Sequence, residues 1–383
     1  MAAESARASA AVGVDIGGAN LKLADSSGAS VACSFPMWSQ AERLAQCLRT
    51  QFAALCQQTQ RRYTRVAVTM TGEMADCFHS RAAGVAAILE HVSSAFPDLP
   101  LAIYGVDGRW RTSRQAREQP WDVAASNWHG LASWIGQALF KGSDPIRLVL
   151  DVGSTTVDII PLLHGRVASP ARCDSDRLRM KQLVYTGVGR TPIAAILDNI
   201  DFDGQQWPLV AERFATSDDA YVALGLIEGD CSLDSDSTGN SAARVHDTAD
   251  GRPRSVYYAQ ARLARMLGED LQRLSANQVL KLARQVVDAQ AQRIAEGIIH
   301  NLSSMAPPSG VHAAVEFDDT SSTSGSETLP WVVVSGHGRC LADAALAKVP
   351  VPVRPVYLED LLSPQGARCA PAVAVAWLLE QCR

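Results

Sequence analysis

The chain carries VDIGGANLK at residues 14–22 and LDVGSTTVD at residues 150–158. Each stretch runs from apolar residues to an aspartate, turns through glycine, and leaves through small polar residues into another apolar run. This pattern predicts a strand, a tight turn and a second strand, because a Cβ would block both the turn and the approach of an anion to the backbone N–H groups. The two aspartates are 136 residues apart (151 − 15), so the sequence predicts two related halves that face each other across a phosphate-binding cleft.

The composition is that of a folded protein with two domains. At 383 residues the chain is long for one core, and its 47% hydrophobic and 20% charged residues are ordinary for a soluble protein. The net charge of −5, without a long basic run, argues against nucleic acid as a partner. No stretch reaches the roughly 18 to 20 apolar residues of a membrane span, so no membrane partner is expected.

The nine cysteines are scattered, and an odd number cannot all pair within one chain. This favours reduced thiols and a cytoplasmic location over a disulfide framework. We expect cysteines such as Cys47, Cys56 and Cys382 to fill apolar space and not to bind a metal.

Strands that alternate with helical periodicity predict an α/β fold. We expect the first domain to cover residues 12–145 and the second to cover 146–369, because the segment around 141–145 breaks the pattern. Two polar insertions, near 230–254 and 316–328, interrupt the second domain.

Three later segments extend the pattern of the two turns: VYTGVGRTP at 184–192, VVSGHG at 333–338 and APAVAVA at 370–376. Together they resemble the connecting and adenosine motifs of the actin, sugar-kinase and Hsp70 ATPase superfamily. Within it the chain most resembles the hydantoinase/oxoprolinase-like branch, and there the tetrahydromethanopterin-linked one-carbon transfer proteins. VTMTGEMADCF at 68–78, YGVDG at 104–108 and AASNW at 124–128 carry this narrower likeness.

The resemblance implies two ribonuclease-H-like (actin-like ATPase) domains facing a central cleft, with residues 370–383 returning to the first domain. It implies a transferase of methanofuran biosynthesis that joins an aminomethylfuran-methyl diphosphate to the phenol of tyramine or γ-glutamyltyramine and releases diphosphate. The partners would then be small molecules, and a homodimer is one expectation for the assembly. The alternative is an ATP-dependent kinase or hydrolase of the hydantoinase/oxoprolinase type. A nucleotide-gated regulatory protein ranks last, since the chain shows no added partner-binding module.

The two turns supply most of the expected phosphate contacts through backbone N–H groups, hydroxyls and one ammonium group. The expected residues are Gly17, Gly18, Asn20, Lys22, Gly153, Ser154, Thr155, Thr156, and, before a predicted helix at 191–200, Gly187 and Gly189. Asp15 and Asp151 are expected to hold Mg²⁺ against the phosphate groups. Alternation along the strands places Asp158 on the face opposite Asp151. The plain alternative is a hairpin with a surface lysine.

The remaining candidate site residues lie outside the two glycine turns. Glu73 follows a strand at a Gly72 turn and could accept the phenol proton, although a solvated turn acid is the plainer interpretation; Asp76 is a weaker candidate. Asn127 lies in an apolar run and would need a partner if buried. By resemblance, Gly336, His337 and Gly338 face a nucleoside or substrate.

Two departures from the kinase pattern favour the transferase. Ala19 and Asn20 stand where many kinases of the superfamily carry a hydroxyl, and His337 replaces the third glycine of the nucleoside motif. ATP is therefore expected as a ligand only under the alternative function.

Overall fold

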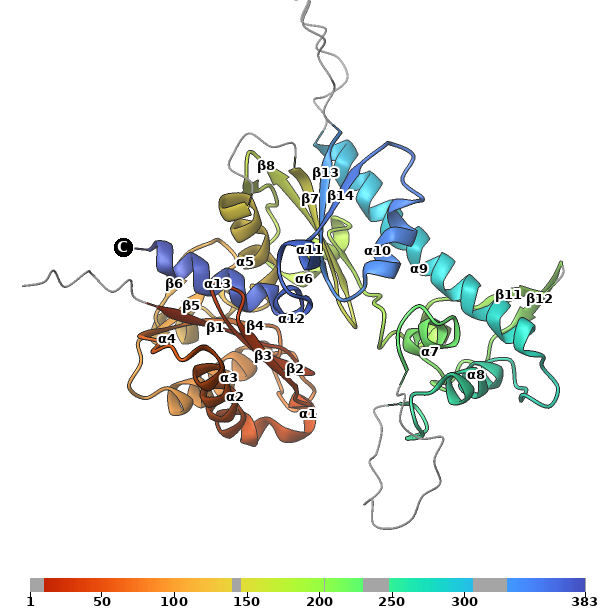
Figure 1. Cartoon of the computed structure of the whole chain (residues 1–383), viewed down its shortest axis with the longest axis horizontal. Helices are drawn as coiled ribbons and strands as arrows, with labels where there is room; N and C mark the ends of the chain where they lie inside the picture. Colours follow the sequence, from red (N-terminus) through yellow and green to blue (C-terminus); the bar gives the residue numbers. More distant parts are fainter. Residues whose placement is uncertain (1–9, 140–145, 203, 230–247, 306–328, 383) are drawn as a thin grey trace, which may run out of the picture.

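The computed structural model describes residues 10–139, 146–202, 204–229, 248–305 and 329–382. Two six-stranded sheets form its framework, and Figure 1 shows them in the two lobes of the molecule. The polar insertions expected at 230–254 and 316–328 lie largely outside the described residues, as does the expected boundary at residue 145. Among the described residues, no helix combines the length and the apolar character that a bilayer crossing requires.

The first sheet has the strand order β3-β2-β1-β4-β5-β6. Its strands β1, β2 and β3 form an antiparallel meander, whereas β1, β4 and β5 run parallel. Their bounds are β1 Ala11–Ile16, β2 Asn20–Asp25, β3 Ser30–Ser34, β4 Arg65–Met70, β5 Leu101–Tyr104 and β6 Trp110–Arg111. All six residues of β1 are buried, as expected for a central strand that is covered on both faces.

The second sheet repeats this plan with the order β10-β8-β7-β13-β14, while β9 pairs with β8. Strands β7 and β8 are antiparallel, and β7, β13 and β14 run parallel. Their bounds are β7 Ile146–Val152, β8 Val157–Leu163, β9 Arg166–Val167, β10 Leu183–Val184, β13 Trp331–Gly336 and β14 Arg354–Tyr357. The repeated order confirms the predicted α/β class with two ribonuclease-H-like domains.

Helices cover both faces of both sheets. The outer faces pack against α2 and α3 in the first domain and against α9 and α10 in the second. The shared core between the sheets contains α5 and α13 (Figure 1). These helices are α2 Leu44–Thr59, α3 Arg81–Ala95, α5 Asn127–Trp134, α9 Ala276–Ser304, α10 Arg339–Leu346 and α13 Ala370–Gln381.

Helix α13 returns to the first sheet and packs on β1. Gly13 permits this approach, because a Cβ at that position would lie 1.9 Å from the carbonyl oxygen of Ala372. One face of the first sheet is thus covered by a helix that follows all strands of the second sheet in the sequence.

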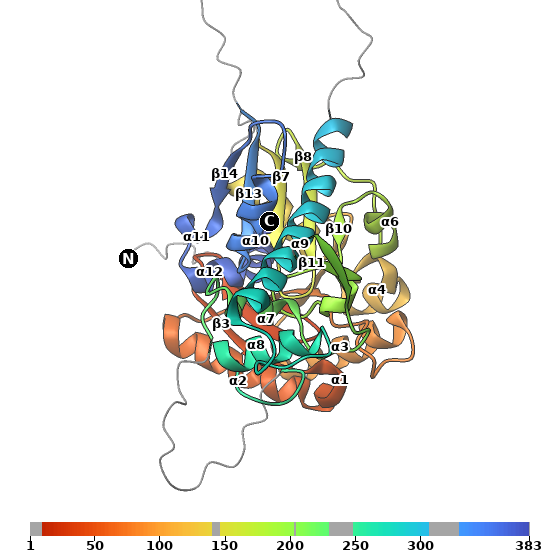
Figure 2. The same cartoon turned by 90° about the vertical axis from the view of Figure 1, so that its right-hand side faces the viewer.

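A smaller unit packs against the N-terminal half of α9. It contains the hairpin β11–β12 with the helices α7 and α8, and Figure 2 shows it beside α9. The bounds are β11 Asn199–Phe202, β12 Gln205–Pro208, α7 Ser217–Ala223 and α8 Val256–Arg265. The predicted helix at 191–200 is wrong: a single 3₁₀ turn, Ile193–Ala195, is followed by β11, because pairing with β12 takes residues 199–202 into a hairpin.

Shorter helices complete the connections. They are α1 Met37–Gln40, η1 Ala41–Arg43, α4 Ser113–Glu118, η2 Pro120–Asp122, the π-helix η3 Ile135–Leu139, α6 Asp174–Arg179, α11 Leu358–Leu361 and α12 Pro364–Arg368. Helices α3 and α6 matter most for the site, since each begins at the boundary between the two domains.

Candidate active site

The two glycine turns have the same backbone geometry. The N–H of Gly17 donates to the carbonyl of Asn20 at 3.0 Å, and the N–H of Gly153 donates to the carbonyl of Thr156 at 3.0 Å. Each turn joins the central strand of its sheet to the next antiparallel strand. The predicted strand, turn and strand are therefore present twice, once in each domain.

Asp15 is the second-last residue of the buried strand β1 and is 3% exposed. Its Oδ2 atom lies 3.4 Å from Nζ of Lys22, the residue directly opposite on β2. Its Oδ1 atom is buried and has no hydrogen-bond partner among the described residues. A buried carboxylate oxygen without a partner is unfavourable, so it is suited to receive a cation or a donor from a ligand.

The charges of Asp15 and Lys22, in the first hairpin, both affect the pKa of Asp151 in the second. Burial raises the pKa of Asp151 to about 6, and the neighbouring Asp158 adds to this rise while Lys22 opposes it. Burial lowers the pKa of Lys22, but its neighbours, with Asp15 and Asp151 as the largest contributors, raise the pKa overall, so the ammonium group is stabilised. The charges of the two turns therefore act on one another across the domain boundary.

The predicted orientation of Asp158 is wrong. Asp158 is paired directly with Asp151 across β7 and β8, so the two side chains share one face of the sheet. Alternation holds along one strand and does not carry across a hairpin. Asp158 is buried and forms an ion pair with Arg177 of α6, whose guanidinium lies 4.5 Å from the centre of the Trp128 ring.

Gly187 and Gly189 pack closely against the second turn. The N–H of Gly189 donates to the carbonyl of Ser154 at 3.0 Å, and that of Gly187 donates to Oγ1 of Thr191 at 3.0 Å. A Cβ on Gly187 would lie 2.5 Å from the carbonyl oxygen of Gly153. Both N–H groups are thus engaged within the protein, and their contact with phosphate stays a prediction.

Gly336, His337 and Gly338 link β13 to α10 beside the same turn. The N–H groups of His337 and Gly338 both donate to the carbonyl of Val152, at 3.1 and 3.2 Å. Gly336 has a φ of +86°, and a Cβ there would lie 2.2 Å from the same oxygen. Close packing therefore requires glycine at this position, while the side chain of His337 is exposed.

Glu73 follows β4 and lies next to the first hairpin, since the N–H groups of Thr71 and Gly72 both donate to the carbonyl of Ile16 at 2.9 Å. Its side chain is 1% exposed, which excludes the solvated turn acid. Burial raises the pKa of Glu73 to about 7, an effect that Arg81 partly offsets. A carboxylate with a pKa near neutrality suits proton transfer. The weaker candidate, Asp76, is exposed.

The side chain of Asn127 finds a partner within the protein, because its Oδ1 accepts a hydrogen bond from the N–H of Trp128 at 2.8 Å. Ala125, two residues before Asn127, has a φ of +48°, a left-handed conformation that is uncommon for a residue with a Cβ. Substrate contact by Asn127 stays a prediction, and the backbone before it is held in a sparsely populated conformation.

Residues 64–376 match the family model described as hydantoinase/oxoprolinase. The chain belongs to the hydantoinase/oxoprolinase family. This confirms the resemblance that the glycine turns and the segments around them suggested.

Two curated relatives of this family member carry the same name, (4-{4-[2-(gamma-L-glutamylamino)ethyl]phenoxymethyl}furan-2-yl)methanamine synthase. The relative from Methanocaldococcus jannaschii is 30% identical over 291 residues, which cover 75% of this chain and 80% of the relative. The relative from Methanococcus vannielii is 32% identical over 137 residues, which cover 36% of this chain and 55% of the relative.

Solved structures that align with most of the chain show much lower identity. A ROK family glucokinase from Streptomyces griseus, in complex with glucose and AMPPNP, is 12% identical with a TM-score of 0.45, and the alignment covers 96% of this chain and 98% of that one. The activator of the 2-hydroxyisocaproyl-CoA dehydratase from Clostridium difficile, with bound ADPNP, is 11% identical with a TM-score of 0.40, covering 97% and 96%.

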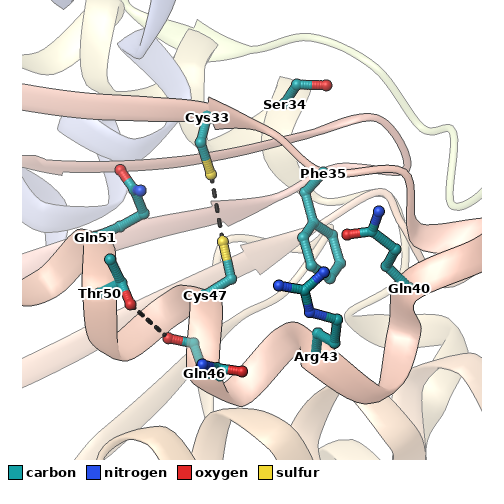
Figure 3. A pocket seen from close by; sticks show the side chains of 9 residues that line it. All are labelled: Cys33, Ser34, Phe35, Gln40, Arg43, Gln46, Cys47, Thr50 and Gln51. Atoms are coloured by element: carbon teal, nitrogen blue, oxygen red, sulfur yellow. Dashed lines mark hydrogen bonds between the residues drawn. The ribbon is translucent and has the colours of Figure 1, made fainter. Parts of the chain in front are cut away.

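One pocket of this family member lies outside the predicted site. It has a volume of about 280 Å³ between β3 and α2, and none of the predicted site residues lines it (Figure 3). The thiols of Cys33 and Cys47 point toward each other there, with their Sγ atoms 3.4 Å apart. Cys47 and Cys56 pack partly buried against the core, as predicted, whereas Cys382 is exposed.

Three charged residues beside Glu73 and Asp151 were missed from the sequence. Arg81 begins the long helix α3, and Asp174 and Arg177 lie in the short helix α6; none of them belongs to a recognisable motif. Arg81 and Asp174 are 93 residues apart in the chain and meet only because the domains do. The one local signal is the cap at Ser80, which fixes where α3 begins and thereby places Arg81.

Proposed function

We propose that the chain is a transferase that forms an aryl–alkyl ether in methanofuran biosynthesis. It condenses an aminomethylfuran-methyl diphosphate with the phenol of tyramine or γ-glutamyltyramine and releases diphosphate. The observation that carries this proposal is the match to the Methanocaldococcus jannaschii synthase, which spans 80% of that enzyme and names the phenoxymethylfuran product. We further propose that the enzyme works on small molecules in the cytoplasm, alone or as a homodimer.

The two glycine turns would bind the diphosphate of the donor. Gly17, Gly18 and Asn20 would approach it from the first turn, and Lys22 would neutralise part of its charge. The second turn would add the hydroxyl groups of Ser154, Thr155 and Thr156, and Gly153 would let the phosphate approach the backbone of the turn. Stabilising the leaving diphosphate is the main catalytic problem when the C–O bond breaks, because the electron pair leaves with the phosphate oxygen.

Asp15 and Asp151 fit a bound Mg²⁺. Asp15 offers an unpartnered carboxylate oxygen, and Asp151 lies within electrostatic range of it. Among the described residues, no cluster of three or more histidine, cysteine or acidic side chains is arranged to hold a metal ion. Two carboxylates are the expected protein share for Mg²⁺, which takes its other ligands from phosphate oxygens and water. When bound, Mg²⁺ would neutralise charge on the leaving diphosphate.

Glu73 would serve as the general base. As the furanylmethyl carbon loses diphosphate, the phenol oxygen bonds to that carbon and its proton passes to the Glu73 carboxylate. A free phenol has a pKa of about 10, so a base improves this step. Glu73 follows β4 beside the first turn, so a donor bound at that turn would have its reacting carbon near this base. Asn127 and the segment from Gly336 to Gly338 would line the organic part of the substrates.

The test is to incubate the purified chain and Mg²⁺ with a synthetic furanylmethyl diphosphate and tyramine. We expect diphosphate release, measured with a pyrophosphatase-coupled phosphate assay, and an ether product with the matching mass. Asp15→Asn serves as the matched control, since it keeps the shape of the side chain and removes its charge. Absence of coupled product with both tyramine and γ-glutamyltyramine would reject the proposal.

The family match also favours a second candidate, an ATP-dependent kinase or hydrolase of the hydantoinase/oxoprolinase type. Under this alternative the same turns would bind Mg·ATP, and the segment at Gly336 would face the nucleoside. Release of ADP from Mg·ATP, dependent on Asp15 and on an added acceptor, would support it. No ADP release under conditions that yield the ether would reject it.

A further inference from the structure

An ion pair crosses the domain boundary near Glu73. Nη2 of Arg81, the first residue of α3, lies 3.1 Å from Oδ2 of Asp174, the first residue of α6. The guanidinium of Arg81 is also 4.8 Å from the centre of the Trp121 ring, and its side chain is 8% exposed. The pair thus joins the first domain to the second through a nearly buried arginine.

Arg81 keeps unused hydrogen-bonding capacity in this position. Its Nε and Nη1 atoms are buried and lack a hydrogen-bond partner among the described residues. Oε2 of Glu73 is likewise buried and without a partner in this part of the chain. The Arg81 guanidinium and the Glu73 carboxyl group are therefore both buried, and each has an atom without a hydrogen-bond partner within the described part of the chain. The charge of Arg81 lowers the pKa of Glu73.

Helix α3 fixes this arrangement. Gly84 packs directly on the backbone of Glu73, since a Cβ there would lie 2.1 Å from the carbonyl oxygen of Glu73. Arg81 lies three residues before Gly84, about one helical turn away. The same helix that supports the Glu73 backbone therefore presents the arginine to its side chain.

We propose that Arg81 and Asp174 are positioning residues for Glu73, and that their ion pair across the domains decides when Glu73 can accept a proton from the acceptor substrate. This inference rests on the proposed function for the identity of that substrate. The two residues act in opposite directions. The guanidinium favours the charged carboxylate of Glu73, whereas the Asp174 carboxylate disfavours it.

Two further groups of the second domain lie near this ion pair. Nη1 of Arg177, in α6, lies 3.9 Å from Oδ1 of Asp174, and Arg177 also forms an ion pair with Asp158. The positive charge of Arg177 therefore offsets part of the negative charge of Asp174. Tyr185 follows β10 with an exposed side chain and lies within electrostatic range of Glu73, Asp174 and Arg81. Domain contact therefore brings the Asp174 carboxylate toward Glu73, whereas Arg81 is held there by helix α3 of the first domain.

The experiment measures the titration of Glu73 directly, in the full chain. Carbon-13 NMR of protein labelled at the glutamate carboxyl carbon follows this group, and the spectrum of Glu73→Gln assigns its signal. We expect Arg81→Met to move the titration midpoint up by about one pH unit and Asp174→Asn to move it down by about one pH unit. Arg81→Lys should fall between wild type and Arg81→Met, because it keeps the charge.

A purely structural ion pair would behave differently. Breaking it from either side would then give equal losses of stability and midpoint shifts that are absent or have the same sign, and either result overturns the inference. Arg179→Met is the matched control, since it removes an exposed arginine from the same helix α6 and should leave the midpoint unchanged.

A kinetic measurement distinguishes failure of this inference from failure of the proposed function. The rising limb of the pH profile of kcat/KM for diphosphate release should move in the same opposite directions. Opposite NMR shifts without any diphosphate release would reject the proposed function and leave the tuning of Glu73 established. Diphosphate release with unshifted midpoints would reject the tuning alone.

Discussion

Lys22 and Asp158 occupy the same register position in the two hairpins and carry opposite charges. Lys22 stands opposite Asp15, seven residues away, and Asp158 stands opposite Asp151 at the same separation. The first hairpin therefore brings its own cation, whereas the second brings two adjacent carboxylates and takes its cation from Arg177. The two turns are alike in backbone and unlike in charge, so the donor diphosphate should depend most on the first.

This asymmetry makes Lys22 the most informative single substitution for donor binding. We expect Lys22→Met to lower kcat/KM for the furanylmethyl diphosphate by about 10²-fold, because an ammonium group near a developing phosphate charge is lost. Lys22→Arg should retain part of the rate. Initial rates of diphosphate release at varied donor concentration give the answer, and unchanged kinetic constants would remove Lys22 from the site.

Gly18 allows binding to be separated from folding. A Cβ at Gly18 meets open space, whereas one at Gly13 meets the backbone of Ala372 at 1.9 Å. We expect Gly18→Ala to leave Tm unchanged and to lower kcat/KM for the donor at least about tenfold, because the methyl group would stand between the turn and the phosphate.

Gly13→Ala should behave in the opposite way and lower the free energy of unfolding by about 1–3 kcal/mol through overpacking of α13 against β1. Urea unfolding followed by circular dichroism measures it. Equal stability losses in the Gly13 and Gly18 variants would contradict the assignment of Gly18 to binding.

The pKa of Glu73 near 7 predicts the shape of the activity profile. A base must be deprotonated, so kcat/KM should rise about tenfold per pH unit below pH 7 and level off above it. Glu73→Gln should flatten this limb and lower the rate by about 10² to 10⁴-fold. Rates in a constant-ionic-strength buffer series test it, and an unchanged limb in the variant would assign the limb to another group.

The same group should affect stability. Burial raises the pKa of Glu73 from its ordinary value near 4.5 to about 7, so between these values the folded chain holds the proton more tightly than the unfolded chain. The free energy of unfolding should therefore fall as the pH rises through this window, by up to about 3 kcal/mol from this residue. Below it both states are protonated, and above it both are charged.

Glu73→Gln removes this contribution. We expect the variant to gain stability relative to wild type between pH 5 and pH 7.5, with the difference measured by urea unfolding at both pH values. A difference that does not change with pH would show that Glu73 is not protonated in the folded state near neutrality.

The parts of the site that are local in sequence were predictable, and the parts made by packing were not. The glycine and aspartate residues of the two turns predict the turn geometry, because each turn is formed within nine consecutive residues. The burial of Glu73 depends on α3 and on the segment before Asn127, so the motif alone could not separate a buried base from a solvated acid.

Two errors have the same physical origin. Alternation predicts the wrong face for Asp158 because it ignores the partner strand, which sets the register of the hairpin. The helix expected at 191–200 is lost because pairing between β11 and β12 outweighs local helical periodicity. The ion pair between Arg81 and Asp174 has no sequence signature, since the docking of two domains creates it.

The return of α13 to β1 also sets the order in which the protein can be built. During synthesis the ribosome has produced the entire second domain before residues 370–381 exist. Until then β1 lacks the helix that Gly13 is shaped to receive, and one face of the first sheet is left without its cover. The N-terminal lobe should therefore become protease-resistant only after translation reaches this helix, although its own strands emerge first.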